Sequence, residues 1–145
     1  MPAVRGATLC LLNVERARRG MTSLRPSLQL RTSAQRYSQA MVQLSFFSHI
    51  SPSGGTLRGR VRHGTTYMRR AGNYLLGENL AWRTVDEVTA RQTVAAWMQS
   101  PIHRAVILDA RFHDIGIGIA IGVPHDSAET PAATYTSHFG RHLVR

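Results

Sequence analysis

Three ionisable residues of this chain lie in apolar surroundings, and their types are those that metal binding or proton transfer requires. Glu78 lies in the segment YLLGENLAW, His49 in FFSHISP and His103 in WMQSPIHRAVIL. A carboxylate among apolar residues is costly to bury unless another group pairs with it. We therefore expect Glu78 to have polar partners, and the two histidines are the first candidates.

Two kinds of chemistry, and one purely structural role, fit these residue types. Two histidines and a carboxylate are sufficient ligands for a divalent metal with an open position, as in catalytic zinc sites. Alternatively, Glu78 holds one imidazole in a fixed tautomer and forms a general-base pair. The third interpretation is a structural polar cluster without a ligand. No H-E-x-x-H motif is present to decide between them.

The surroundings of His103 favour a neutral imidazole. A helix is predicted over 100–110, with Ser100 as its N-cap and Pro101 as its first residue. His103 is then the third helical residue, where the positive end of the helix dipole disfavours imidazolium. The neutral form is the one that binds a metal or accepts a proton.

The elements that must position these residues are helices first and then a mixture of helices and strands. Apolar periodicity predicts further helices over 9–20, from after Ser27 to about residue 44, and over 57–64. A capping box of Thr84 and Glu87 predicts another helix over 85–99. Alternation predicts strands over 74–82, 115–122 and 133–140, the last two as an antiparallel hairpin. In IGIGIAIG (115–122) the isoleucines share one face, and the small face allows close packing. This order indicates an α+β fold with a mainly antiparallel sheet covered by helices.

Composition limits the classes of function. The length of 145 residues suits one domain, spanning 1–145. All 18 basic residues are arginine and the net charge is +10, but the arginines are dispersed and no aromatic residues alternate with them. We therefore expect a solvated basic surface, including the Arg58, Arg60 and Arg62 run, and no specific nucleic-acid site.

The chain contains no run of about 20 apolar residues that would span a membrane. The first residues do not form a convincing signal peptide, so we expect either a cytoplasmic protein or an export segment that this chain lacks. Cys10 is the single cysteine, which excludes an internal disulfide. It is expected to be a small buried hydrophobe.

Six segments in order resemble the CAP superfamily of cysteine-rich secretory, antigen 5 and plant pathogenesis-related proteins, especially its short bacterial members. They are LLNVERARRG, FFSHISPSGGTLRGRV, GENLAW, WMQSPIHRAVIL, DIGIGIAIG and TYTSHFG, and they extend over almost the whole chain. The resemblance implies a three-layer α-β-α sandwich with a central, mainly antiparallel sheet. This agrees with the fold class predicted from the residues.

The resemblance also implies a surface cavity that contains His49, Glu78 and His103. An alternative to a solvated face for the Arg58, Arg60 and Arg62 run is the rim of this cavity, if the short helix over 57–64 lies over it. Many eukaryotic members have a second glutamate after the tryptophan of the preceding helix, where this chain has Ser100. The departure weakens the case for acid–base catalysis and leaves a two-histidine metal site, with zinc or another divalent cation, completed by water. Asn79 is expected to face away from the cavity and hold the strand, and Asn13 to make a structural hydrogen bond.

Residues outside this set are expected to have ordinary roles. Trp82 and Trp97 are predicted to be core residues. A surface position is predicted for the remaining histidines, which are His63, His113, His125, His138 and His142.

Two functions follow. The favoured one is an extracellular or cell-envelope binding module, as the resemblance implies, without catalysis and with a lipid, glycan or cell-wall polymer as its ligand. The alternative is a metal-dependent peptidase or esterase in which Glu78 activates water as a general base.

Overall fold

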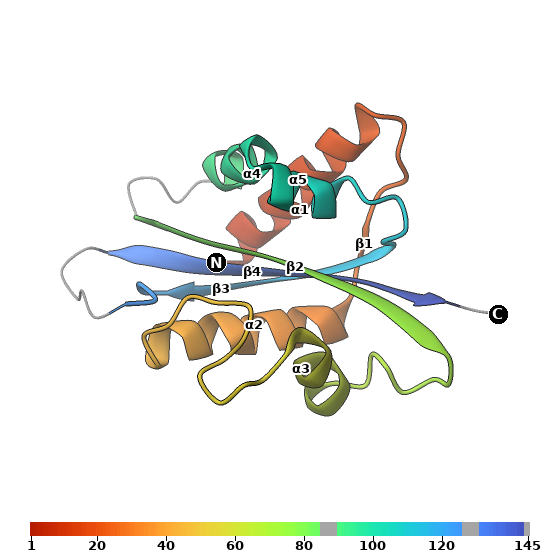
Figure 1. Cartoon of the computed structure of the whole chain (residues 1–145). Helices are drawn as coiled ribbons and strands as arrows, with labels where there is room; N and C mark the ends of the chain where they lie inside the picture. Colours follow the sequence, from red (N-terminus) through yellow and green to blue (C-terminus); the bar gives the residue numbers. More distant parts are fainter. Residues whose placement is uncertain (85–89, 126–130, 144–145) are drawn as a thin grey trace.

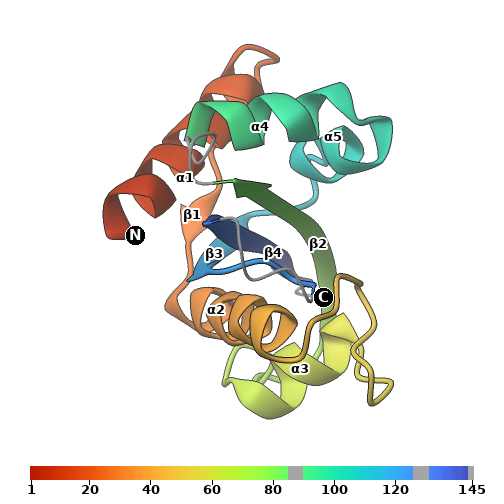
Figure 2. The same ribbon diagram turned by 90° about the vertical axis from the view of Figure 1, so that its left-hand side faces the viewer.

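The computed structural model describes residues 1–84, 90–125 and 131–143 and has three layers, as predicted. Helices α1 (Pro2–Ala17), α4 (Ala90–Gln99) and α5 (Pro101–Ile107) cover one face of the sheet. Helices α2 (Leu28–Gln43) and α3 (Leu57–Gly64) cover the other (Figures 1 and 2). Among the described residues, no helix is long and apolar enough to cross a membrane.

The sheet is mainly antiparallel, and the long strand β4 lies inside it. Its strands are β1 (Arg25–Pro26), β2 (Asn73–Thr84), β3 (Asp114–Ile121) and β4 (Ala132–Leu143), in the order β1-β3-β4-β2. The predicted hairpin is present as the antiparallel pair β3 and β4. The two-residue β1, which was not predicted, pairs in parallel with β3. Because β4 is an inner strand and helices cover both faces of the sheet, its residues are buried from Ala132 to Gly140.

The small face of β3 determines how closely α2 can approach. A Cβ atom built at Gly116 would lie 2.0 Å from the amide nitrogen of Arg31, and one at Gly118 would lie 2.2 Å from that of Gln35. The Gln35 side chain bonds both backbone groups of Ile119, at 2.8 and 2.9 Å. Helix α2 therefore lies directly on the β3 backbone. The isoleucine face of β3 packs in the main core with Trp97, a predicted core residue, on the opposite side of the sheet.

Four expectations about single residues or helix bounds change. The helix predicted over 9–20 spans Pro2–Ala17 as α1. Cys10 is exposed rather than buried, because α1 turns a different stripe, Thr8, Leu12 and Arg16, toward the interior. Trp82 is 38% exposed, because it lies near the end of the edge strand β2.

The predicted helix over 100–110 ends at Ile107. Glu87, with the start of the helix predicted over 85–99, lies outside the described residues.

We predict that Gly118→Ala lowers the free energy of unfolding by at least about 2 kcal/mol, because the new methyl group would overlap the backbone of α2. Urea denaturation measures the change. Gly6→Ala is the matched control: a Cβ there meets nothing within 4 Å, and alanine stabilises a helix by about 0.5–1 kcal/mol relative to glycine. Equal stability of the two variants would contradict the close packing of α2.

Candidate functional site

Glu78 forms a buried cross-strand pair with His138. The two residues are opposite each other in the β2–β4 ladder, and Glu78 Oε2 lies 2.7 Å from His138 Nε2. Glu78 is 8% exposed and His138 is fully buried. The predicted surface position of His138 is therefore wrong, because β4 is a central strand and α2 lies over the face that carries this imidazole.

Arg60 is the second partner of the same carboxylate. From α3, its Nη2 donates to Glu78 Oε2 at 2.8 Å and to the His49 carbonyl at 3.1 Å. Its Nη1 donates to the Gly55 carbonyl at 3.1 Å, and its guanidinium lies 3.5 Å from the centre of the Tyr37 ring. Arg60 is thus not part of a solvated basic run, as the sequence suggested. It joins α2, α3, β2 and the loop that carries His49.

His49 is the third partner, and it lies in the loop between α2 and α3. Its Nδ1 is 2.7 Å from Glu78 Oε1, and its side chain is 58% exposed. The loop is held in place by the Tyr37 hydroxyl, which donates to the Ser48 carbonyl, and by Arg60. The imidazole is therefore held on its Nδ1 side and open to solvent elsewhere.

These contacts set the protonation states. Burial alone would raise the pKa of Glu78, but hydrogen bonds from His138 and His49 and the nearby Arg60 charge lower it to about 2. The pKa of His138 is lowered by burial, which outweighs its bond to Glu78. A neutral His138 that donates from Nε2 also fits its buried Nδ1, which has no partner among the described residues. The hydrogen bond to Glu78 raises the pKa of His49.

His103 is held by a different neighbour. Its Nδ1 lies 2.7 Å from the Ser100 Oγ atom. Ser100 is the N-cap residue of α5, as predicted, but its side chain caps no backbone group and bonds the imidazole instead. Burial lowers the pKa of His103, and the charge of His49 lowers it further. The neutral form expected from the helix dipole thus has burial as its main cause.

Two asparagines tie neighbouring elements together. Asn79, next to Glu78 on β2, donates from Nδ2 to the His103 carbonyl at 3.0 Å and so joins β2 to α5. Asn13 makes the structural bonds expected of it, to the amide and carbonyl of Leu24 at 2.8 and 3.1 Å.

The donor set for a metal is small. No group of three or more histidine, cysteine or acidic side chains is placed to hold a metal in the described part of the chain. Glu78 is occupied by its three donors. The atoms left over are the Nε2 atoms of His49 and His103, which have no hydrogen-bond partner within the described ranges.

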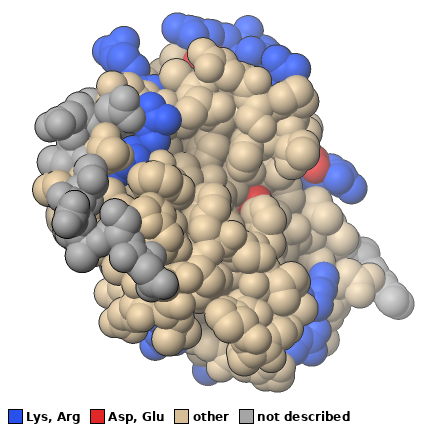
Figure 3. Space-filling model, turned by 60° about the vertical axis from the view of Figure 1, so that its left-hand side comes forward, with Lys and Arg blue, Asp and Glu red and all other residues tan. Residues whose placement is uncertain are grey.

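An open groove of about 440 Å³ lies beside His49 and Glu78. Its other lining residues are mostly apolar, with one arginine, and are Ile50, Thr56, Leu57, Arg58, Tyr74, Leu75 and Leu76. Ser100 and His103 do not line it. The structure thus places His49 and Glu78 at the groove. His103 and Ser100 lie at the start of α5, which is beside β2, the strand that carries Glu78. Figure 3 shows one face of the molecule, on which the arginines lie toward the margins and the middle is mostly uncharged.

Sequence reasoning missed His138 and took a solvated face as the default for Arg60, with the rim of the cavity as the alternative. The alternation of TYTSHFG places His138 on the same strand face as Thr134 and Thr136, and a buried polar face was the available signal. Only the strand order shows that this face meets Glu78.

Comparison with known proteins agrees with the architecture. The model of the cysteine-rich secretory protein (CAP) family matches residues 9–136. The chain is 34% identical over 109 residues to the uncharacterized protein YkwD and 31% identical over 111 residues to the uncharacterized membrane protein YlbC, both of Bacillus subtilis (strain 168). These matches cover 74% and 77% of this chain but 39% and 30% of the two relatives. The chain therefore spans well under half the length of either relative.

Two solved structures have the same fold. An extracellular protein containing a SCP domain from Bacillus anthracis is 26% identical, with a TM-score of 0.75, over 97% of this chain and 41% of that one. An outer surface protein from Borrelia burgdorferi is 18% identical, with a TM-score of 0.72, over 93% and 90% of the two chains.

We predict that Glu78→Gln destabilises the protein by on the order of 3 kcal/mol at pH 7, because the pKa of Glu78 falls from 4.5 to about 2 on folding. A lowered carboxyl pKa contributes stability above about pH 4.5 that is lost as the pH falls through about 2. The difference between wild type and variant should therefore narrow toward pH 2, as measured by urea denaturation at several pH values.

Glu15→Gln is the control, because within the described residues Glu15, on α1, forms ion pairs only with the exposed Arg18 and Arg19 just after that helix. Such surface pairs contribute about 1 kcal/mol or less. A difference between wild type and Glu78→Gln that stays constant from pH 7 to pH 3 would contradict the assigned pKa.

Proposed function

The chain belongs to the cysteine-rich secretory protein (CAP) family, and we propose that it is an extracellular binding module in which His49 and His103 hold a divalent cation. The observation that carries the proposal is that each imidazole is oriented through Nδ1, by Glu78 and by Ser100, at 2.7 Å in both cases. Histidine ligands of metals are commonly fixed in this way, with the opposite nitrogen turned to the metal.

The donor set suits a borderline cation such as zinc, with water completing the coordination. Glu78 would not itself be a ligand. Its hydrogen bond to His49 Nδ1 would make the opposite nitrogen of that imidazole a stronger electron-pair donor to the metal. A bound cation would supply a positive charge for an anionic or carbonyl group of the ligand. The apolar lining of the neighbouring groove, with Arg58 beside it, supports a lipid, glycan or cell-wall polymer as that ligand.

The geometry favours binding over hydrolysis. A general base needs a pKa near the working pH. Glu78 instead accepts bonds from His49, Arg60 and His138, and its pKa of about 2 makes it a very weak base. The metal-dependent hydrolase expected as the alternative therefore finds no support in the environment of this carboxylate.

An extracellular position is supported by two proteins of the same fold. The similar Bacillus anthracis protein is described as extracellular and the Borrelia burgdorferi protein as an outer surface protein. We extend that location to this chain as part of the proposal.

Calorimetric titration with Zn²⁺ at pH 7.5 tests the site. We expect one ion per chain, with the affinity reduced by at least about tenfold in His49→Ala and in His103→Ala, since each loses one of two protein ligands. His113→Ala is the control, because only the backbone groups of His113 make hydrogen bonds within the described residues. Equal binding by wild type and all three variants, or no binding by wild type, would refute the two-imidazole site.

A further inference from the structure

A second groove, the edge groove, lies at the outer edge of β3. Residues 115–117 of β3 form its floor, and its walls include Arg5 and Leu9 of α1 and Leu28 and Arg31 of α2. Its volume is about 480 Å³. β1 pairs only with the start of β3, and no other strand of the described chain covers this edge. The edge groove therefore lies on the opposite side of the sheet order from β2, with α1 and α2 on either side of it (Figure 2).

The backbone of Ile117, in the floor of the edge groove, lacks hydrogen-bond partners. Because the β3–β4 register is regular, alternate residues of β3 turn their amide and carbonyl groups away from β4. The Ile115 carbonyl accepts from the Ser27 amide at 2.8 Å, which shows this outward direction. Both backbone groups of Ile119 point outward too, because they bond the Gln35 side chain.

Ile117 lies between these two residues and points the same way. No group of the described chain bonds its amide or its carbonyl. Ile117 is 2% exposed, and buried backbone groups without partners cost free energy. A ligand that supplies one donor and one acceptor at this point would recover that free energy.

The Gln35 side chain shows what chemistry fits this edge. Its carboxamide donates to the Ile119 carbonyl at 2.8 Å and accepts from the Ile119 amide at 2.9 Å. One residue of a paired strand would make the same two bonds. Ile117 offers the next such position along β3, about 7 Å away. An extended peptide is therefore the ligand whose own backbone matches the unpaired groups.

The walls of the edge groove offer apolar contacts on both sides. Leu9 contributes from α1 and Leu28 from α2, and Leu28 is 61% exposed. A large exposed apolar side chain in a concave site indicates an apolar ligand group. Because side chains of a strand alternate between its two faces, those of an added strand would point toward α1 and α2 in turn.

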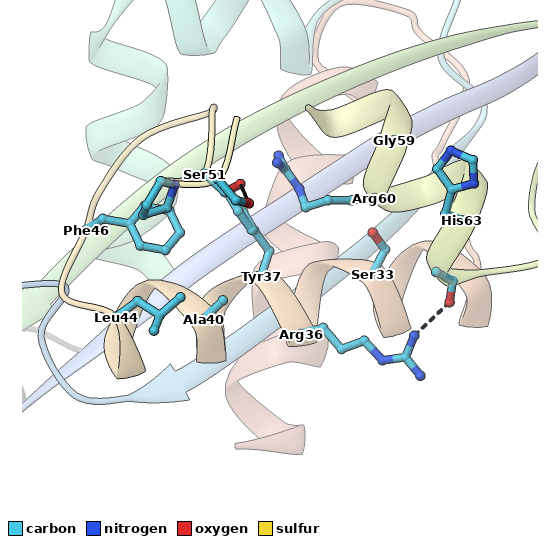
Figure 4. Close-up of a pocket in the computed structure, with 13 residues that line it drawn as sticks. Ser33, Arg36, Tyr37, Ala40, Leu44, Phe46, Ser51, Gly59, Arg60 and His63 are labelled. Carbon is cyan, nitrogen blue, oxygen red and sulfur yellow. Dashed lines mark hydrogen bonds between the residues drawn. The ribbon is translucent and has the colours of Figure 1, made fainter. Parts of the chain in front are cut away.

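Each wall also carries an arginine without an acidic partner. The side chains of Arg5 and Arg31 make no hydrogen bond or ion pair with the described residues. Both also line an adjoining hollow of about 350 Å³ that contains Arg36. Arg36 donates to the Gly64 carbonyl at 2.7 Å (Figure 4), which uses one of its five N–H donors. No aspartate or glutamate of the described chain lines either hollow, so charge complementarity selects carboxylates.

We propose that the edge groove binds an extended peptide segment in which two apolar residues adjoin two acidic residues. The peptide backbone pairs with Ile117 and adds a short strand to the sheet. Since alternate side chains face opposite walls, such a segment presents one apolar and one acidic residue to each wall. The apolar residues contact Leu9 and Leu28, and the carboxylates reach Arg5 and Arg31. The site goes beyond the proposed cation site and shares no residue with it.

An NMR titration of the ¹⁵N-labelled chain tests the proposal. The probes are acetyl-Val-Val-Glu-Glu-amide and acetyl-Glu-Glu-Val-Val-amide, which cover both directions of an added strand. We expect saturable binding of at least one, with the Ile117 amide among the resonances that shift most, because its N–H gains an acceptor. The same peptides with lysine in place of glutamate should bind at least about tenfold more weakly. So should the better acidic peptide with N-methyl groups on its two central nitrogens, because it cannot donate to the Ile117 carbonyl.

Arginine variants separate a site from general attraction by charge. Arg5→Gln and Arg31→Gln should each weaken binding of the acidic peptide about tenfold, as expected for loss of a charge-assisted hydrogen bond. Arg104→Gln is the control, because it removes the same charge from an exposed position of α5 outside both hollows.

A second pair of variants separates binding from folding. Leu28→Asp should abolish binding of the acidic peptide, whereas Leu44→Asp, at the similarly exposed C-cap of α2 outside both hollows, should not. Leu28→Asp should not lower the melting temperature, because the first turn of α2 contains no acidic residue and a negative charge there is favourable.

Four results would overturn the proposal: no binding of either acidic peptide, no shift of the Ile117 amide at saturation, equal binding of the N-methylated peptide, or equal losses in Arg31→Gln and Arg104→Gln. The last would mean that the net charge of +10 attracts acidic peptides without a site. His103→Ala should bind the acidic peptides as wild type does. Loss of zinc binding alone would therefore count against the cation site and leave the edge groove standing.

Discussion

The structure depends on one buried carboxylate that three basic groups share. Glu78 accepts hydrogen bonds from His138 on β4, Arg60 on α3 and His49 on the loop before α3, at 2.7 to 2.8 Å. Unpaired, the charge would be very costly at this depth. Because the donors come from separate elements, satisfying this charge also fixes where α3 and the loop lie on the sheet. Removing one member of such a cluster leaves a buried charge uncompensated, which costs much more than the loss of a surface ion pair.

The same arrangement decides what the site can do. A carboxylate that accepts three hydrogen bonds from basic groups is a weak base, so Glu78 contributes to the site by orienting His49. Ser100 does the same for His103 without a charge, and Asn79 holds the backbone of that residue on β2. The result is two imidazoles, each held through its Nδ1 atom. Arg60 connects this cluster to α2, because its guanidinium lies 3.5 Å from the centre of the Tyr37 ring.

Much of the fold was accessible from the sequence because its signals are local. The alternation of glycine with isoleucine in residues 115–122 predicted both the strand and the close approach of a helix, and α2 lies on that glycine face. The α3 boundaries, 57–64, were predicted as observed. Errors arose where a local pattern does not show which face of an element is turned toward the core. The helix that contains Cys10 was predicted, but the stripe that α1 turns inward depends on α4 and β3, which lie far along the chain.

The sequence by itself determined that Glu78 must have partners, because the free energy of burying a carboxylate depends on its neighbours in any fold. It also supplied His49 as a candidate, and the distance between His49 and Glu78 agrees with that expectation. Only the tertiary structure decided that His138 and Arg60 complete the cluster. Strand order placed His138 opposite Glu78, and the packing of α3 turned one arginine of a basic run inward. Contacts of this kind join residues 18 and 60 positions apart, and no periodicity within one segment encodes which distant segment will face it.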